Sequence, residues 1–185
     1  KVHCRITPNR KQTERWLHWR VGLKLGMKKE TITFDTGKYV GEVKEGKPHG
    51  KGTLTYPDGS KMEGEWKNGM LNGKGSAVVY EDGKIRTTYS GQFKDNEYHG
   101  KGTLTYPEKK EYIGEFKNGS RHGKGSETYS DGTKYVGEYK NAKADLFGTL
   151  TTALGHKYVG EWKNDKCDGK GTLTYPDKKK YVGQF

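Results

Sequence analysis

A 23-residue pattern recurs along this chain and limits what the chain can fold into. Its most regular element is Tyr-x-Gly-Glu, and successive copies are separated by 23, 27, 23, 23, 23 and 23 residues. A fixed period of this length is typical of repeat architectures, in which one small unit cannot bury its own apolar face and stacks on its neighbours. We therefore expect one extended array. The motif glycines are Gly41, Gly64, Gly91, Gly114, Gly137, Gly160 and Gly183.

The composition favours a folded array over a disordered chain. Apolar residues make up only 29% of the 185 residues, which alone would suggest disorder, but the content of 4 Trp, 13 Tyr and 5 Phe and the strict period argue against it. No run reaches the ~18 apolar residues of a membrane span, and no signal peptide is visible. Cys4 and Cys167 are too few for a secreted disulfide scaffold, so we expect reduced thiols in an intracellular, cytoplasmic protein. The chain starts at Lys1 and residues 181–185 open a seventh repeat without closing it, so we expect a piece of a longer polypeptide.

Each repeat reads as a β-hairpin. With Tyr39 as position 1, positions 1–6 (residues 39–44) and 12–18 (residues 50–56) alternate as strands do. Asn-Gly pairs such as Asn68-Gly69 predict a tight turn inside the repeat, because both residues accept positive φ. Asp-Gly pairs such as Asp58-Gly59 supply the turn into the next repeat. The predicted fold is all-β, an elongated, twisted antiparallel meander of tandem hairpins.

The period of two assigns the side chains of each repeat to two faces. We place positions 1, 3, 5, 12, 14, 16 and 18 on one face, where aromatic rings would lie flat on glycines. The other face carries Glu at position 4 and Lys at positions 6 and 13, which we expect to form a solvated, cross-paired surface.

The repeat unit, Tyr-x-Gly-Glu-(Trp/Phe/Tyr)-Lys-x-Gly-x-x-His-Gly-Lys-Gly-x-x-x-Tyr-x-Asp-Gly, resembles the MORN (membrane occupation and recognition nexus) repeat. The match covers residues 39–185, and residues 1–38 are left as a basic N-terminal cap or degenerate repeat. The resemblance implies a twisted antiparallel sheet with an aromatic groove and non-enzymatic work as a scaffold, a dimerisation surface or a docking groove. It also implies anionic phospholipid binding in some members, and membership of ciliary and cytoskeletal assemblies.

Two repeats depart from the pattern. The second (residues 62–88) has four extra residues near Lys84, where we expect a longer loop or a bulge. The fifth (residues 135–157) replaces His-Gly-Lys-Gly by Asp145-Leu146-Phe147-Gly148. The face assignment sends Leu146 into the aromatic groove and Phe147 out among the charges. Phe147 is thus a candidate contact residue. The alternative is that the fifth repeat has drifted in sequence without a functional reason, because single exposed apolar residues are normal.

The positive charge is concentrated near the N-terminus. The net charge is +12, and residues 1–38 hold 10 Lys/Arg against 3 Asp/Glu. Arg15, Arg20 and Lys24, close to two Trp, are candidate anion-binding residues. We favour a capping role for this segment, with residues 31–38 as the second strand and turn of a worn repeat and residues 21–27 as a strand beside it.

The chain shows no convincing catalytic, metal or cofactor site. His49, His99 and His122 share position 11, but equivalent positions in adjacent repeats lie ~9.6 Å apart, too far for ligands of one zinc ion. The Gly-x-Gly pairs precede no helix, so a phosphate loop is unsupported. We expect no enzyme activity, no cofactor and no metal.

The function predicted is that of a protein–protein interaction module. A helix or strand of a partner, or a second MORN array, would lie in the aromatic groove. The alternatives are peripheral binding to anionic membranes and service as the accessory domain of a larger enzyme; nucleic acid is disfavoured because the array is nearly charge-balanced. The expected groove residues are Tyr89, Tyr112, Tyr135, Tyr158, Trp66, Phe93, Phe116 and Trp162.

Overall fold

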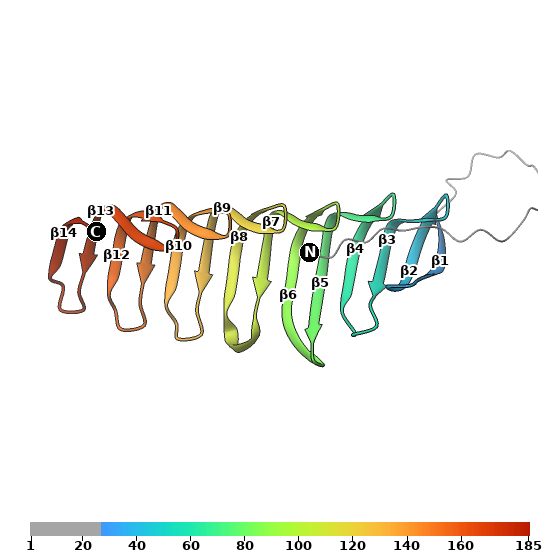
Figure 1. Ribbon diagram of the computed structural model, residues 1–185, viewed down its shortest axis with the longest axis horizontal. Helices are drawn as coiled ribbons and strands as arrows, with labels where there is room; N and C mark the ends of the chain where they lie inside the picture. The colour runs from blue at the N-terminus through green and yellow to red at the C-terminus, as the bar shows by residue number, and fades with distance from the viewer. Residues whose placement is uncertain (1–26) are drawn as a thin grey trace, which may run out of the picture.

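Residues 27–185 form one open antiparallel sheet of 14 strands that follow one another in chain order (Figure 1). A computed structural model describes residues 27–185. The strands are β1 (Lys28–Phe34), β2 (Gly37–Lys44), β3 (Lys47–Thr55), β4 (Lys61–Lys67), β5 (Met70–Glu81), β6 (Lys84–Lys94), β7 (Glu97–Thr105), β8 (Glu111–Lys117), β9 (Ser120–Thr128), β10 (Lys134–Lys140), β11 (Lys143–Thr151), β12 (Lys157–Lys163), β13 (Lys166–Thr174) and β14 (Lys180–Gln184). A single 3-10 turn, η1 (Pro107–Lys109), separates β7 from β8. Within residues 27–185 no helix is long and apolar enough to span a membrane.

The turns inside the repeats are two residues long, as predicted. Both turn residues have positive φ, for example Asn68 (53°) with Gly69 (86°) and Asn118 (50°) with Gly119 (75°). This is the geometry of type I′ turns, whose twist matches that of the flanking strands. Asn141 (51°) and Ala142 (67°) adopt it too, so the fifth repeat keeps the turn without a glycine.

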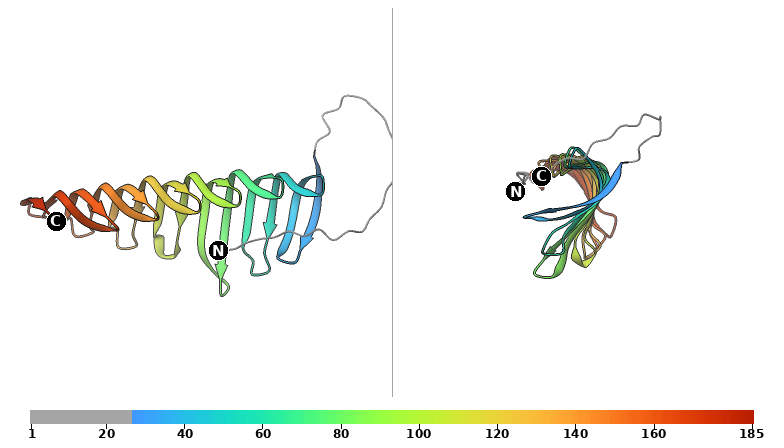
Figure 2. Two further views of the ribbon diagram at one scale, coloured as in Figure 1. Left: turned by 45° about the horizontal axis from the view of Figure 1, so that its top comes forward. Right: turned by 90° about the vertical axis from the view of Figure 1, so that its right-hand side faces the viewer.

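The sheet is curved in cross-section (Figure 2), and two local features of each repeat account for the bend. The register within a hairpin shifts just after the motif glycine, as between Gly114 and Glu115. On the partner strand, position 12 is left-handed, as at Gly50 (φ 60°) and Gly123 (φ 58°). An extra residue of this kind bends and twists the strand that carries it. The bend recurs in every repeat and gives the sheet an inner face.

Tyrosine at position 1 packs on two glycines of the inner face. A Cβ placed on Gly125 would lie only 2.5 Å from Cε2 and 2.6 Å from Cζ of Tyr112, so the ring rests directly on the backbone. The Tyr112 hydroxyl donates a hydrogen bond to the Glu115 carbonyl at 2.9 Å. Tyr39 and Tyr158 make the same bond to the carbonyl at position 4, each at 2.8 Å. The predicted packing of rings on glycines is thus confirmed.

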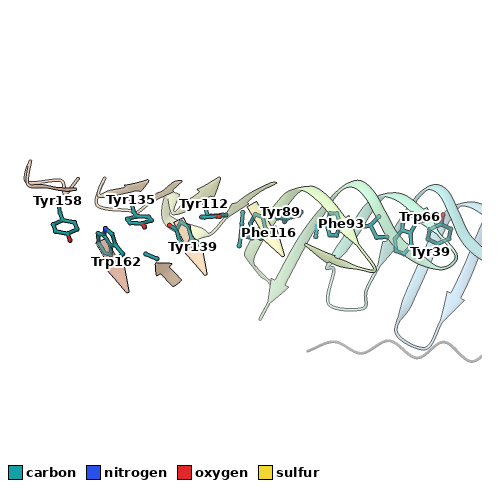
Figure 3. Packing of buried hydrophobic residues seen from close by; sticks show 14 residues of the cluster. Tyr39, Trp66, Tyr89, Phe93, Tyr112, Phe116, Tyr135, Tyr139, Tyr158 and Trp162 are labelled. Atoms are coloured by element: carbon teal, nitrogen blue, oxygen red, sulfur yellow. The ribbon is translucent and has the colours of Figure 1, made fainter. Parts of the chain in front are cut away.

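The rings form a ladder that runs along the array (Figure 3). From the third repeat to the sixth, each position-1 tyrosine meets an aromatic ring at position 5 of its own repeat and of the next, whereas Tyr39 meets only Trp66 of the next repeat because its own position 5 is Val43. Tyr112, for instance, contacts Phe116 (5.1 Å between centroids) and Tyr139 (5.0 Å), both edge-to-face. Such pairs contribute about 0.5–1.5 kcal/mol beyond the area they bury. In the second repeat Met62 takes the tyrosine position, so the ladder of rings is interrupted there.

Two segments that depart from the repeat pattern form strands: the residues before the first repeat and the insertion in the second repeat. Strand β1 includes the predicted residues 31–34 but starts earlier, and it pairs with β2 from Lys28↔Val43 to Phe34↔Gly37. The predicted strand at residues 21–27 lies, except for Met27, outside the described residues. The four extra residues of the second repeat lengthen β5 and β6 and produce a register shift between Val79 and Tyr80, so the predicted bulge is confirmed.

Candidate functional site

The eight aromatic residues predicted to line a groove are core residues. Their exposed fractions run from 0% for Tyr112 to 8% for Trp162. Because the sheet bends around them, these rings already bury their surface against glycines and each other, and leave little free apolar area for a partner. The full set is Tyr89, Tyr112, Tyr135, Tyr158, Trp66, Phe93, Phe116 and Trp162.

The inner face keeps a second column of tyrosines, at position 18, that is only partly covered. Tyr56, Tyr106 and Tyr129 are half-buried, and Tyr175 is 40% exposed. Each stands where a second strand ends and the turn to the next repeat begins. We call these four residues the tyrosine column. Next to it lie partly buried leucines of position 16, Leu54, Leu150 and Leu173, which pack against the core.

A buried ionic cluster interrupts the leucines in the fourth repeat. Position 16 there is Glu127, which is only 3% exposed. Its Oε1 lies 2.6 Å from Nη1 of Arg121 and 3.2 Å from Nζ of Lys110. Its Oε2 accepts hydrogen bonds from the hydroxyls of Tyr129 (3.0 Å) and Tyr139 (3.3 Å). Two cations and two hydroxyls thus surround one carboxylate whose desolvation would otherwise be costly.

Both cations of the cluster also lie over aromatic rings. Lys110 Nζ is 5.2 Å from the Tyr106 ring centre and 5.1 Å from that of Tyr129. The Arg121 guanidinium lies 5.3 Å from the Tyr139 ring and donates to the Ala142 carbonyl at 2.7 Å. Burial, and then the nearby charge of Glu127, raise the pKa of the Tyr129 phenol to about 12. This hydroxyl therefore stays a neutral donor at physiological pH.

The sequence reasoning missed this cluster, although the signal was present. Glu127 stands where Leu54 and Leu104 stand in other repeats, and Lys110 stands where Ser60 and Thr133 stand. A charged residue at a core position, together with a cation at a turn of the preceding repeat, is the pattern that could have identified it.

The tandem hairpins correspond to a known repeat family. The family model described as "MORN repeat" matches residues 39–61, 63–77, 89–109, 112–134 and 158–180, more than half of the chain. The chain belongs to the MORN repeat family. The search of curated proteins found no match. Among solved structures, a similar chain is the TCP domain of SAS-4 (dCPAP) of Drosophila melanogaster, in complex with a proline-rich motif of Ana2 (dSTIL). It is 13% identical, the alignment covers 92% of this chain and 98% of that chain, and the TM-score is 0.47.

On the outer face of the MORN array, the acidic side chains at position 4 make other contacts than the predicted pairs with lysine. In the first four repeats the side chain at position 4 folds back over the left-handed glycine of position 12 and accepts a hydrogen bond from the backbone N–H of position 13. Glu42 accepts from Lys51 and Glu65 from Lys74, both at 3.3 Å. In these four repeats the position-4 side chain therefore contacts the backbone where we expected an ion pair with lysine. This contact stabilises the bend of the repeat.

The fifth MORN repeat corrects one of the two predictions made for it. Leu146 does not enter the groove; it is 58% exposed and has φ +65°. The reason is that position 12 belongs to the bend, where alternation no longer decides the direction of a side chain. Phe147 is 54% exposed and opposes Glu161 on the outer face, as predicted. It borders a shallow hollow shared with Val159 and Val182. A role for Leu146 and Phe147 in contacts stays a prediction.

The remaining predicted site residues, Arg15, Arg20 and Lys24, lie outside the described residues. Among residues 27–185, no group of three His, Cys, Asp or Glu side chains could hold a metal ion.

Proposed function

We propose that this MORN array is a non-catalytic docking module that receives a segment of a partner protein along the tyrosine column. The observation that supports this most is the contrast within one face. In the six complete repeats the rings of positions 1 and 5 are buried, whereas Tyr56, Tyr106, Tyr129 and Tyr175 remain partly exposed to solvent. Tyrosine offers large contact area and a polar hydroxyl with few rotatable bonds, which is why it is enriched in binding hot spots.

The shape of the inner face fits an elongated partner. Adjacent repeats place their tyrosines two strands apart, ~10 Å, so the column presents anchors along the long axis of the array. A helix, an extended strand or the edge of a second array could lie along it.

Paired crosslinking positions test the docking face. Leu173 packs against the core, so alternation along the chain directs its neighbour Thr174 to the outer face and Tyr175, the next residue, to the inner face. A photoreactive benzoylphenylalanine is placed at Tyr175 in one variant and at Thr174 in the other. We expect a partner to be crosslinked from position 175 and not from position 174. The purified partner should then bind at least about tenfold more weakly, a loss of ~1.4 kcal/mol, when Tyr56 and Tyr175 are replaced by serine in a still-folded array. Equal crosslinking from both positions, or unchanged affinity, would contradict the proposal.

A second candidate function, binding to anionic membranes, is favoured by a row of lysines. Every first strand of a complete repeat ends with an exposed lysine at position 6, beside the turn of its hairpin. The row consists of Lys44, Lys67, Lys94, Lys117, Lys140 and Lys163. Each basic residue near an anionic surface contributes about 1 kcal/mol, so a membrane that touched several of them would be held appreciably.

Vesicle flotation separates the membrane candidate from protein docking. With phosphatidylserine vesicles at low salt, binding through the lysine row should be strong, weaken as salt is added, and disappear when Lys67, Lys94, Lys117 and Lys140 are all replaced by glutamine. Replacing the tyrosine column should leave it unchanged. An array that does not float at low salt is not a membrane module.

A further inference from the structure

We propose that Tyr106, Tyr129 and Glu127 form a binding site for an alkylammonium or guanidinium group of the docked segment, and that Lys110 occupies this site when no partner is bound. We call these three residues the cation cage. The proposal rests on the docking function, because two of its members belong to the tyrosine column, and it specifies the chemistry that the column recognises there: a cationic side chain.

The position of Lys110 shows that the cage accepts an ammonium group. Its Nζ is almost equidistant from the Tyr106 and Tyr129 ring centres, at 5.2 and 5.1 Å, and lies 3.2 Å from Glu127 Oε1. Ring faces carry negative electrostatic potential, and cations within about 6 Å of the centroid are attracted. Two ring faces and a carboxylate whose side chain is 4% exposed therefore select against an anion.

Lys110 can leave the cage without stranding the buried carboxylate. Arg121 holds Glu127 Oε1 at 2.6 Å independently of Lys110, and its own side chain is 21% exposed against 37% for Lys110. The arginine is thus the structural partner, whereas the lysine is the one that solvent reaches. An incoming cation would replace one charge by another and leave the charge balance of the cluster unchanged.

The turn that carries Lys110 is unlike the other turns between repeats. Its left-handed residue is Glu108 (φ +64°), which is aligned with Asp58 and comes one position earlier than the left-handed Gly59 (+88°) and Gly132 (+87°) of other repeats. At the position of Lys110, Ser60 bonds to Asp58 and also accepts from the N–H of Tyr80 in the next repeat. The third repeat gives up these short turn bonds for a long side chain that crosses to Glu127.

Vacating the cage tests the proposal with small probes. Lys110→Ala removes the resident ammonium, and Lys110→Ser restores the residue that the first repeat carries there. The probes are n-butylammonium and tetramethylammonium chloride, followed through the NMR signals of the Tyr106 and Tyr129 rings. We expect saturable shifts in both variants, with affinity at least about tenfold greater than in the unsubstituted array, because a tethered competitor is gone. Lys179→Ala is the matched control: Lys179 occupies the same repeat position but pairs with Asp177 at 2.9 Å.

Three results would overturn the proposal. They are the absence of saturable shifts in both folded Lys110 variants, equal shifts with sodium acetate, and undiminished binding when Glu127→Gln is added to Lys110→Ala. The probes need no partner protein. A failure here therefore leaves protein docking standing, whereas a failure of the Tyr175 crosslinking leaves the cation cage standing.

Discussion

Gly125→Ala should destabilise the array by about 2–3 kcal/mol, although strand propensity alone predicts the opposite sign. Alanine is favoured over glycine in a strand interior by about 0.5–1 kcal/mol, and the backbone of Gly125 is not left-handed. The added methyl, however, would lie 2.5 Å from Cε2 of Tyr112, which is fully buried. Overpacking costs about 1–3 kcal/mol, and a ring pushed off the glycine loses its bond to the Glu115 carbonyl, worth about 1 kcal/mol more.

Urea unfolding and hydrogen exchange would measure this effect. The matched control is Gly119→Ala, at a turn where an added Cβ meets nothing within 4 Å but φ is +75°; its cost should stay near 1–2 kcal/mol. Because stability in such arrays is shared between neighbouring units, Gly125→Ala should also accelerate exchange in β8–β11 more than in β2–β3. Equal costs for the two substitutions would mean that the tyrosine does not depend on a bare backbone.

Arg121→Leu should cost about 3 kcal/mol or more. It leaves Glu127 buried with its closest cation removed, and breaking a buried ion pair from one side typically costs ~3–5 kcal/mol. The lost contacts with the Tyr139 ring and the Ala142 carbonyl add to this. Lys110 remains, but it reaches Glu127 from the solvent side at 3.2 Å and replaces only part of the interaction.

Replacing Arg121, Glu127 and Tyr139 together should restore most of the stability that Arg121→Leu alone removes. The combined variant Arg121→Leu, Glu127→Leu and Tyr139→Phe removes the closest ion pair and one of the two hydroxyls that donate to Glu127, and it leaves the more exposed Lys110 facing solvent. Leucine stands at the equivalent positions in other repeats, as Leu71 and Leu104 show. Because hydrophobic replacement of a buried pair is often neutral or stabilising, its urea midpoint should recover toward that of the original array. A combined variant as unstable as Arg121→Leu alone would show that the cluster does more than neutralise one carboxylate.

The repeat period was enough to predict the fold, because the determinants are local. Asn-Gly turns, alternation along strands and glycines beneath tyrosines all lie within one 23-residue unit. The burial of the aromatic rings was harder to predict, because alternation shows which face of the sheet a ring is on but not how strongly the sheet curves around that ring. Phe116 and Trp162 were therefore assigned to a surface that the bend closes.

The two other discrepancies have equally specific causes. Leu146 was misplaced because an extra residue in the bend interrupts the period of two. Glu127 was overlooked because its role depends on Arg121, six residues earlier on the same strand, and on Lys110, which lies 17 residues away in the preceding repeat. Pattern reading within a single repeat does not detect a cluster assembled from three repeats, with Lys110 in the third and Tyr139 in the fifth.

Each strand pairs only with those just before and after it in the chain, from β1 to β14. Across residues 28–184 the first and last strands do not pair with each other, so the length of the sheet grows with the number of repeats: every additional 23 residues lengthen it by two strand spacings, ~10 Å. A protein built this way can act as a molecular ruler. The span between two bound objects can then be adjusted during evolution by duplicating or deleting whole units, while each individual attachment point keeps its chemistry.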